Sequence, residues 1–148
     1  MESRYPESRA ITRQNRYGEM EMFKTLIVED SHPFRQLLKE NLHERFRSMA
    51  IEEAANGVEA MQKIDSFCPD LIFMDIRLPG ESGLDLTRKI KKQCPTIKII
   101  ILTSYDLPEY RETAQKYGAD HFITKGSSTW EEIATLVKSI ASDSGKPI

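Results

Sequence analysis

The sequence predicts an α/β domain in which helices cover both faces of a five-stranded parallel sheet. From Phe23 onward, short apolar runs alternate with amphipathic segments. The links between them are short, and right-handed strand–helix–strand crossovers leave such a chain few other arrangements. The third apolar run, Leu71–Met74, has four consecutive apolar residues, which is typical of a strand buried on both faces. The domain is therefore expected to be doubly wound.

Five strands and five helices are expected in alternation. The strand-like runs cover residues 24–29, 49–53, 70–74, 97–102 and 120–124. Apolar residues spaced by three or four mark the first and last helices, namely Phe34, Leu37, Leu38 and Leu42, then Trp130, Ile133, Val137 and Ile140. We expect Ser31 to cap the first helix, with Pro33 in its first turn, and Ser82 to cap the third.

Charge and hydropathy exclude several classes of protein. The 148 residues hold 21 Lys and Arg against 23 Asp and Glu, a net charge of -2 that attracts no nucleic acid. The basic cluster of Arg88, Lys89, Lys91 and Lys92 lacks interleaved aromatic residues and is interpreted as a solvated helix face. No apolar run approaches the roughly 18 residues of a membrane span. We therefore expect a cytoplasmic protein that contacts neither nucleic acid nor membrane directly.

The chain divides into three parts. Residues 1–22 are rich in charge, lack periodicity and are expected to form a flexible arm. Residues 23–143 form the domain, and residues 144–148 a C-terminal tail. Met20 and Met22 lie just before the first strand, so translation starting at one of them is a further hypothesis.

Polar residues follow four of the five expected strands. Glu29 and Asp30 follow the first, Asp75 the third, Thr103 the fourth and Lys125 the fifth. Ligands of doubly wound domains bind beyond the carboxyl ends of the strands. The fold is therefore expected to gather these residues into one shallow site.

The residue types in this group indicate magnesium-dependent phosphoryl transfer. Three carboxylates in one place repel one another unless a cation neutralises them, and Mg²⁺ prefers oxygen ligands. Lys125 supplies a compact positive charge and Thr103 a hydroxyl donor for phosphoryl oxygens. Asp75, the acid that stands alone after a central strand, is the expected acceptor.

These residues resemble the receiver domain of two-component response regulators, the phospho-acceptors of sensor histidine kinases. The similarity extends from about Phe23 to Ser142. It rests on the acidic pair, the pattern Asp-x-x-x-Pro-x-x-x-Gly from Asp75 to Gly83, the pair Thr103-Ser104, and Phe122 three residues before Lys125. The resemblance implies a flavodoxin-like (βα)5 fold with strand order 2-1-3-4-5.

The resemblance also assigns roles at the phosphoryl site. Asp75 is implied to attack a phosphohistidine and to carry the acyl phosphate. Asp30 is implied to bind Mg²⁺ directly, Glu29 through water, and Arg77 through its backbone carbonyl. Lys125 is implied to pair with a phosphoryl oxygen.

Other residues are implied to transmit the change. Thr103 is implied to swing and hydrogen-bond the phosphoryl group, for which the small Ser104 leaves room. Phe122 is implied to turn inward and so to alter the surface of the fourth helix, fifth strand and fifth helix, where an output protein or a second copy of the chain is expected to bind. The alternative is that Phe122 is simply a core residue.

The resemblance implies that side chains at two positions, which vary within the receiver family, overlook the phosphoryl group. Arg77 and Tyr105 lie two residues beyond the acceptor and the Thr. Our hypothesis is that they set a long-lived phosphoryl state. The alternative is a solvated Arg and a half-exposed Tyr without a kinetic role.

The favoured interpretation is that the chain is a signalling phospho-acceptor and not an enzyme with a separate substrate. The chain is expected to promote its own phosphorylation and dephosphorylation. Its donor is a sensor histidine kinase or a phosphotransfer protein. A haloacid-dehalogenase-like phosphatase needs a second Asp where Arg77 stands. A phosphorelay intermediate remains an alternative function.

A stand-alone receiver is expected over a truncated DNA-binding regulator. Lys125 precedes Gly126 and two Ser residues, as in receivers with a helix-turn-helix output, but the chain ends at Ile148.

Overall fold

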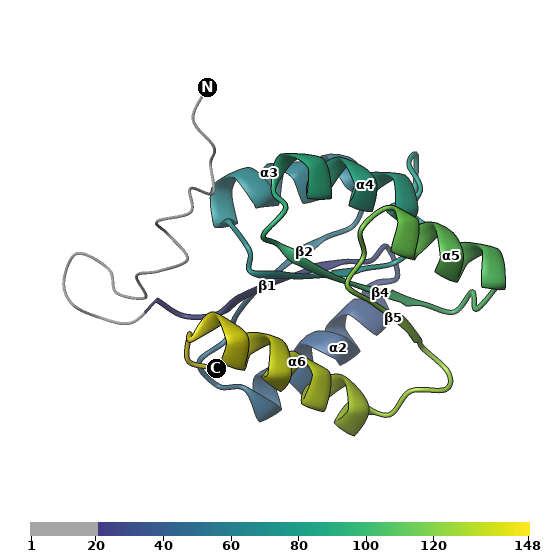
Figure 1. Ribbon diagram of the computed structural model, residues 1–148. Coiled ribbons are helices and arrows are strands. Elements are labelled where there is room, and N and C mark those ends of the chain that lie inside the picture. Colours follow the sequence, from purple (N-terminus) through teal and green to yellow (C-terminus); the bar gives the residue numbers. More distant parts are fainter. Residues whose placement is uncertain (1–20) are drawn as a thin grey trace.

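The computed structural model describes residues 21–148, in which a five-stranded sheet lies between two layers of helices (Figure 1). Helices α3, α4 and α5 cover one face, and α2 and α6 cover the other. The arm expected over residues 1–22 lies outside the described residues except for its last two positions. Met20, one of the two proposed alternative start sites, also lies outside them.

The expected alternation of strands and helices is confirmed, and each strand agrees with its expected bounds to within one residue. The strands are β1 (Lys24–Val28), β2 (Ala50–Ala54), β3 (Leu71–Met74), β4 (Lys98–Thr103) and β5 (His121–Thr124). The helices, labelled as in Figure 1, are α2 (His32–Arg45), α3 (Gly57–Phe67), α4 (Gly83–Gln93), α5 (Pro108–Lys116) and α6 (Trp130–Ser144).

The sheet has the strand order β2-β1-β3-β4-β5 with every pair parallel, as predicted. Val28 at the end of β1 lies opposite Met74 at the end of β3. Met74 in turn lies opposite Ile101 in β4. Because the central strands run in register, the residues that follow β1 and β3 emerge at the same edge of the sheet.

The two helical layers explain why β3 is apolar at every position. Successive side chains of a strand point to opposite faces. Ile72 and Met74 pack in the core beneath α3, α4 and α5, whereas Leu71 and Phe73 pack in the core against α2 and α6. Because helices cover both faces of the sheet, the residues of β3 that point to either face must be apolar.

The predicted helix caps are present. The Ser31 hydroxyl accepts a hydrogen bond from the Phe34 amide at 3.4 Å, and Pro33 lies in the first turn of α2. The Ser82 hydroxyl accepts one from the Leu84 amide at 3.1 Å. Each cap satisfies an amide that the first helical turn leaves without a partner.

The residues expected to form a tail pack against the domain. Helix α6 continues to Ser144, and Gly145 ends it with a φ of 72°. The Lys146 side chain is 4% exposed and its ammonium pairs with Asp70 at 2.8 Å. The Phe23 amide donates to the Pro147 carbonyl at 3.3 Å. The chain end therefore covers the edge of the sheet where β1 and β3 begin.

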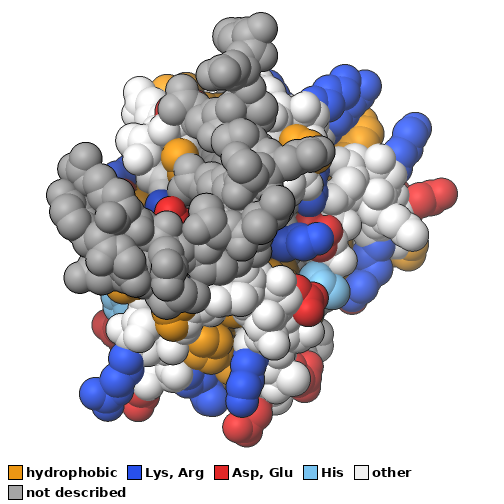
Figure 2. Space-filling model, turned by 60° about the vertical axis from the view of Figure 1, so that its left-hand side comes forward, with side chains coloured by type: hydrophobic (Ala, Val, Ile, Leu, Met, Phe, Trp, Pro, Cys, Tyr) orange, Lys and Arg blue, Asp and Glu red, His pale blue; other side chains and the backbone are white. Residues whose placement is uncertain are grey.

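The surface carries both signs of charge. On the face drawn in Figure 2, Lys and Arg side chains are interspersed with Asp and Glu, and hydrophobic side chains form small separate groups. None of the helices within residues 21–148 has the length and apolar composition needed to cross a membrane.

Gly83 allows α4 to begin directly against the chain that follows β3. A Cβ atom at this position would lie 1.8 Å from the Asp75 carbonyl oxygen. The Gly83 amide also donates to the Ile76 carbonyl at 2.8 Å. The glycine of the Asp-x-x-x-Pro-x-x-x-Gly pattern thus holds the backbone of Asp75 in place.

We predict that Gly83→Ala lowers the free energy of unfolding by roughly 1–3 kcal/mol, because the added methyl group forces the backbone apart. Chemical denaturation measures the change. The matched control is Gly126→Ala, since a Cβ there meets nothing within 4 Å. Equal stabilities of the two variants would show that this close approach imposes no constraint.

Candidate functional site

Three carboxylates converge at the carboxyl edge of the sheet. Glu29 and Asp30 follow β1, Asp75 follows β3, and one oxygen from each lies within 4.8 Å of the others. Glu29 and Asp75 are buried, whereas Asp30 is exposed. The cluster is therefore a pocket of charge that solvent and ligands reach from the side of Asp30.

The environment of Glu29 perturbs the pKa of its carboxyl. Burial raises the pKa of its carboxyl above the ordinary value, and the negative charge of Asp75 acts in the same direction. Hydrogen bonds from Lys125 and from the Ser31 amide, the latter at 3.0 Å, oppose the rise. Negative charge confined in this cluster is therefore unfavourable, and a bound cation would relieve the repulsion.

Lys125 inserts its ammonium group between two of the carboxylates. It hydrogen-bonds to Glu29 Oε1, and its Nζ lies 3.3 Å from Asp75 Oδ2. The Lys125 amide donates to the Thr103 carbonyl at 2.8 Å, which fixes the backbone from which the side chain extends. The ammonium also lies 4.2 Å from the centroid of the Phe34 ring. Backbone and ring together direct the lysine into the acidic cluster.

The Asp75 carboxylate is held in one orientation. Its Oδ1 accepts a hydrogen bond from the Ile76 amide at 2.8 Å, and Oδ2 faces Lys125. The Asp75 amide donates to the Val28 carbonyl at 3.0 Å, which continues the pairing of β1 and β3 beyond the strands. The acid is thus presented by the backbone of the central strands.

The donor set fits a hard divalent cation. All three side chains offer carboxylate oxygen, the ligand that Mg²⁺ prefers, and their separation allows one ion to contact all of them. The positive charge of Lys125 already lies among them. The Arg77 carbonyl as a further ligand stays a prediction.

Thr103, Ser104 and Tyr105 follow one another at the end of β4. Thr103 is fully buried, and its hydroxyl accepts a hydrogen bond from the Tyr105 amide at 3.3 Å. Ser104 is exposed, and Tyr105 is 40% exposed. The Arg77 guanidinium lies 4.2 Å from the centroid of the Tyr105 ring. Arg77 and Tyr105 therefore contact each other and join the loops after β3 and β4.

Phe122 is half-buried against the core beneath α3, α4 and α5. The Arg111 guanidinium lies 4.6 Å from its ring centroid, pairs with Asp106 and reaches the Thr124 hydroxyl at 3.4 Å. The pair with Arg111 lowers the pKa of Asp106. Arg111 was not among the predicted site residues, and its position on a polar helix gives no sequence signal for this contact.

Phe34 is a second residue that the sequence did not single out for the site. Its ring lies under the Lys125 ammonium and stacks on Trp130 with a centroid distance of 6.3 Å. Its place in the apolar repeat of α2 indicated only a core position. The contact connects the acidic cluster to the surface between α2 and α6.

The chain matches known proteins over most of its length. A family model described as the response regulator receiver domain matches residues 25–138. The chemotaxis protein CheY of Halobacterium salinarum is 41% identical over 102 residues, which are 69% of this chain and 83% of that protein. The chain belongs to the response regulator receiver domain family.

A longer relative gives a second comparison. The oxygen regulatory protein NreC of Staphylococcus carnosus is 36% identical over 118 residues, which are 79% of this chain and 54% of NreC. This chain therefore spans about half the length of NreC.

Solved structures share the fold. The response regulator TrrA of Thermotoga maritima, solved in complex with Mg(2+)-BeF, has a TM-score of 0.71 and 38% identity over 80% of this chain and 99% of its own. A CheY-like receiver domain from Methanospirillum hungatei has a TM-score of 0.75 and 26% identity over 84% of this chain and 98% of its own. A DNA-binding regulator of the LuxR family from Staphylococcus aureus has a TM-score of 0.74 and 28% identity over 80% of this chain and 98% of its own.

Membership of this family decides among the functions that the sequence suggested. The chain is a receiver domain of two-component response regulators and so a signalling protein, not a phosphatase of the haloacid-dehalogenase type. The flavodoxin-like fold is confirmed by the strand order and by these structures.

Proposed function

We propose that Asp75 accepts a phosphoryl group from a phosphohistidine of a sensor histidine kinase or a phosphotransfer protein, and that the change alters the surface around α5, β5 and α6. The observation that carries the proposal is the position of the Asp75 carboxylate. It lies next to the Lys125 ammonium and two further acids, with Oδ1 held by the Ile76 amide.

In the proposed step a carboxylate oxygen of Asp75 attacks the phosphorus atom, an oxygen–phosphorus bond forms, and the phosphorus–nitrogen bond to the donor histidine breaks. The imidazole nitrogen that leaves takes up a proton. The Ile76 amide keeps the carboxylate aimed, so little reorientation precedes the attack.

Glu29, Asp30 and Asp75 are proposed to hold Mg²⁺, with the Arg77 carbonyl as a further ligand. When bound, the ion neutralises the carboxylates and the charge on the transferring phosphoryl oxygens. The structure of TrrA was solved in complex with Mg(2+)-BeF, and it shares 38% of its residues with the matched part of this chain.

Lys125 is proposed to exchange partners during the reaction. Its ammonium contacts Glu29 and Asp75 in the unmodified protein. Formation of the acyl phosphate removes negative charge from the Asp75 carboxylate and adds phosphoryl oxygens nearby, so the ammonium gains by contacting one of them. Its backbone, tied to the Thr103 carbonyl, need not move.

Thr103 is proposed to start the conformational change. Its hydroxyl now accepts the Tyr105 amide, so turning to donate to a phosphoryl oxygen breaks that bond. The loop after β4 is then free to shift. Asp106 in that loop pairs with Arg111, whose guanidinium lies over Phe122. A shift of the loop therefore disturbs the contact that holds the Phe122 ring.

The surface around α5, β5 and α6 is proposed to bind the output, either a protein partner or a second copy of the chain. The relative NreC extends well beyond the matched region, and a LuxR-family neighbour is described as DNA-binding. DNA-binding output is therefore an alternative to a separate output partner, and transfer onward to a phosphotransfer protein is another.

We expect wild-type protein incubated with Mg²⁺ and acetyl phosphate to gain one phosphoryl group at Asp75, as measured by peptide mass spectrometry. Asp75→Asn should remain unmodified, because an amide oxygen is a poor nucleophile. EDTA should prevent the modification of the wild type.

The matched control is Asp85→Asn, which removes an exposed acid near the start of α4 and should be modified like the wild type. Modification of Asp75→Asn to the wild-type extent would overturn the assignment of the acceptor.

Arg77 and Tyr105 are proposed to lengthen the life of the phosphoryl group. Their stacked side chains join the two loops that flank Asp75 and Thr103. A ring and a guanidinium in this position hinder the approach of water to the phosphorus atom. The stacking also explains how an exposed Arg is held next to an anionic site.

We predict that Arg77→Ala and Tyr105→Ala each speed dephosphorylation by roughly two- to fivefold, as expected from a contact worth about 0.5–1 kcal/mol. The double variant should be no faster than the faster single one, because the two side chains act as a pair. Tyr105→Phe keeps the ring and should stay close to the wild-type rate. Rates of phosphate release equal to wild type in both alanine variants would refute the proposal.

A further inference from the structure

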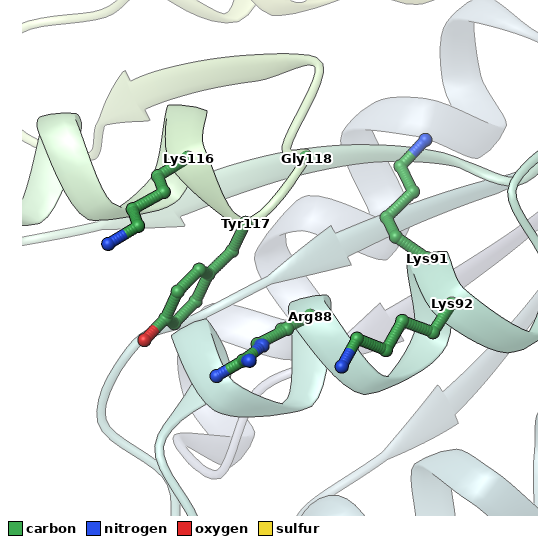
Figure 3. Close-up of a pocket in the computed structure, with 6 residues that line it drawn as sticks. All are labelled: Arg88, Lys91, Lys92, Lys116, Tyr117 and Gly118. Atoms are coloured by element: carbon green, nitrogen blue, oxygen red, sulfur yellow. The ribbon is translucent and has the colours of Figure 1, made fainter.

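A basic hollow lies between the last turns of α4 and α5. It has a volume of about 400 Å³ and is open to solvent. Figure 3 shows its lining residues, which are Arg88, Lys91, Lys92, Lys116, Tyr117 and Gly118. Helix α4 begins against Asp75 at Gly83, so Lys92 lies roughly 14 Å further along the helix axis. The hollow is thus distinct from the acidic cluster.

Three cations of the hollow have no acidic partner among the described residues. Within residues 21–148, no carboxylate forms an ion pair with Arg88, Lys92 or Lys116. Lys91 differs, because its ammonium pairs with Asp120 at 2.8 Å and donates to the Ile97 carbonyl at 2.6 Å. Figure 3 shows that this ammonium points away from the other cations. The uncompensated charge is therefore +3.

Tyr117 supplies an aromatic wall. The Arg88 guanidinium lies 5.1 Å from its ring centroid, and Figure 3 shows the two side chains next to each other. This contact could not be predicted from the sequence, because Tyr117 comes from the end of another helix. Gly118 has a φ of 97°, and a Cβ there would lie 3.3 Å from Lys91 Cγ. The glycine thus lets the stem of Lys91 pack beneath the hollow.

We infer that this hollow binds the carboxylates of an acidic segment of a partner protein. An arginine fork pairs with a carboxylate through two hydrogen bonds, and flexible lysines on either side accept further carboxylates. The Tyr117 ring offers a surface for the methylene groups of Glu side chains. The lining has too few apolar residues for a typical small-molecule pocket.

Spread carboxylates suit the hollow better than a compact phosphate does. Phosphate sites commonly use backbone amides at helix N-termini. The helix ends at this hollow are the C-termini of α4 and α5, whose carbonyl groups repel an anion that comes close. Carboxylates held at the tips of long side chains avoid that repulsion. Because the hollow is separate from Asp75, binding there should not depend on phosphorylation.

The test is an NMR titration of ¹⁵N-labelled protein with an acetylated hexaglutamate peptide. We expect saturable shifts of the amides of Arg88, Lys92 and residues 116–118. Arg88→Gln combined with Lys116→Gln should weaken binding by roughly five- to tenfold, since two exposed charge pairs are lost. Affinity should be the same within about twofold after addition of Mg²⁺ and beryllofluoride, whatever the outcome at Asp75.

The matched control is Arg47→Gln combined with Lys138→Gln, which removes two exposed positive charges elsewhere and should retain wild-type affinity. Parallel titrations use inorganic phosphate and a single-stranded oligothymidylate. An absence of saturable shifts, equal weakening by the control, or tighter binding of phosphate or the oligonucleotide at the same residues would overturn the inference.

Discussion

Mutual repulsion among Glu29, Asp30 and Asp75 is the constraint around which this domain is organised. The parallel register of β1 and β3 brings the three carboxylates within 4.8 Å, two of them buried. Such an arrangement is unfavourable unless positive charge enters it. Lys125 supplies that charge from the end of β5, on the opposite side of β4. One ammonium group against three carboxylates leaves this edge of the sheet negatively charged, and a bound cation or a phosphoryl group changes that balance of charge.

The contacts of Lys125 and Thr103 connect this balance to both surfaces of the domain. Lys125 lies over Phe34, which stacks on Trp130 between α2 and α6. Thr103 accepts the Tyr105 amide in the loop that leads to Asp106, the partner of Arg111 over Phe122. The proposed movements of the Thr103 hydroxyl and the Lys125 ammonium would therefore disturb contacts on two faces of the domain. The basic hollow at the other end of α4 lies outside these connections, which suits a constant anchoring site.

The sequence predicted the strands and the residues of the acidic cluster because both depend on simple rules. Apolar runs such as Leu71–Met74 mark buried strands, and the carboxyl ends of parallel strands share one edge. It did not predict Arg77 on Tyr105 or Arg88 on Tyr117, since such contacts depend on how loops and helix ends approach in space. The packing of residues 145–148 was missed for the same reason. The residues around Lys146 form no pattern that predicts burial, and its partner Asp70 is distant in the chain.

A direct test of this account is the dependence of thermal stability on Mg²⁺ for wild type and Lys125→Met, which keeps the length of the side chain and removes its charge. In EDTA the variant should be less stable by roughly 1–3 kcal/mol, because the buried carboxylates of Glu29 and Asp75 lose the cation that pairs with them. Added Mg²⁺ should stabilise the variant more than the wild type, since the ammonium no longer competes for the same oxygens. Equal stability in EDTA together with an equal gain from Mg²⁺ would contradict the view that Lys125 balances the charge of this cluster.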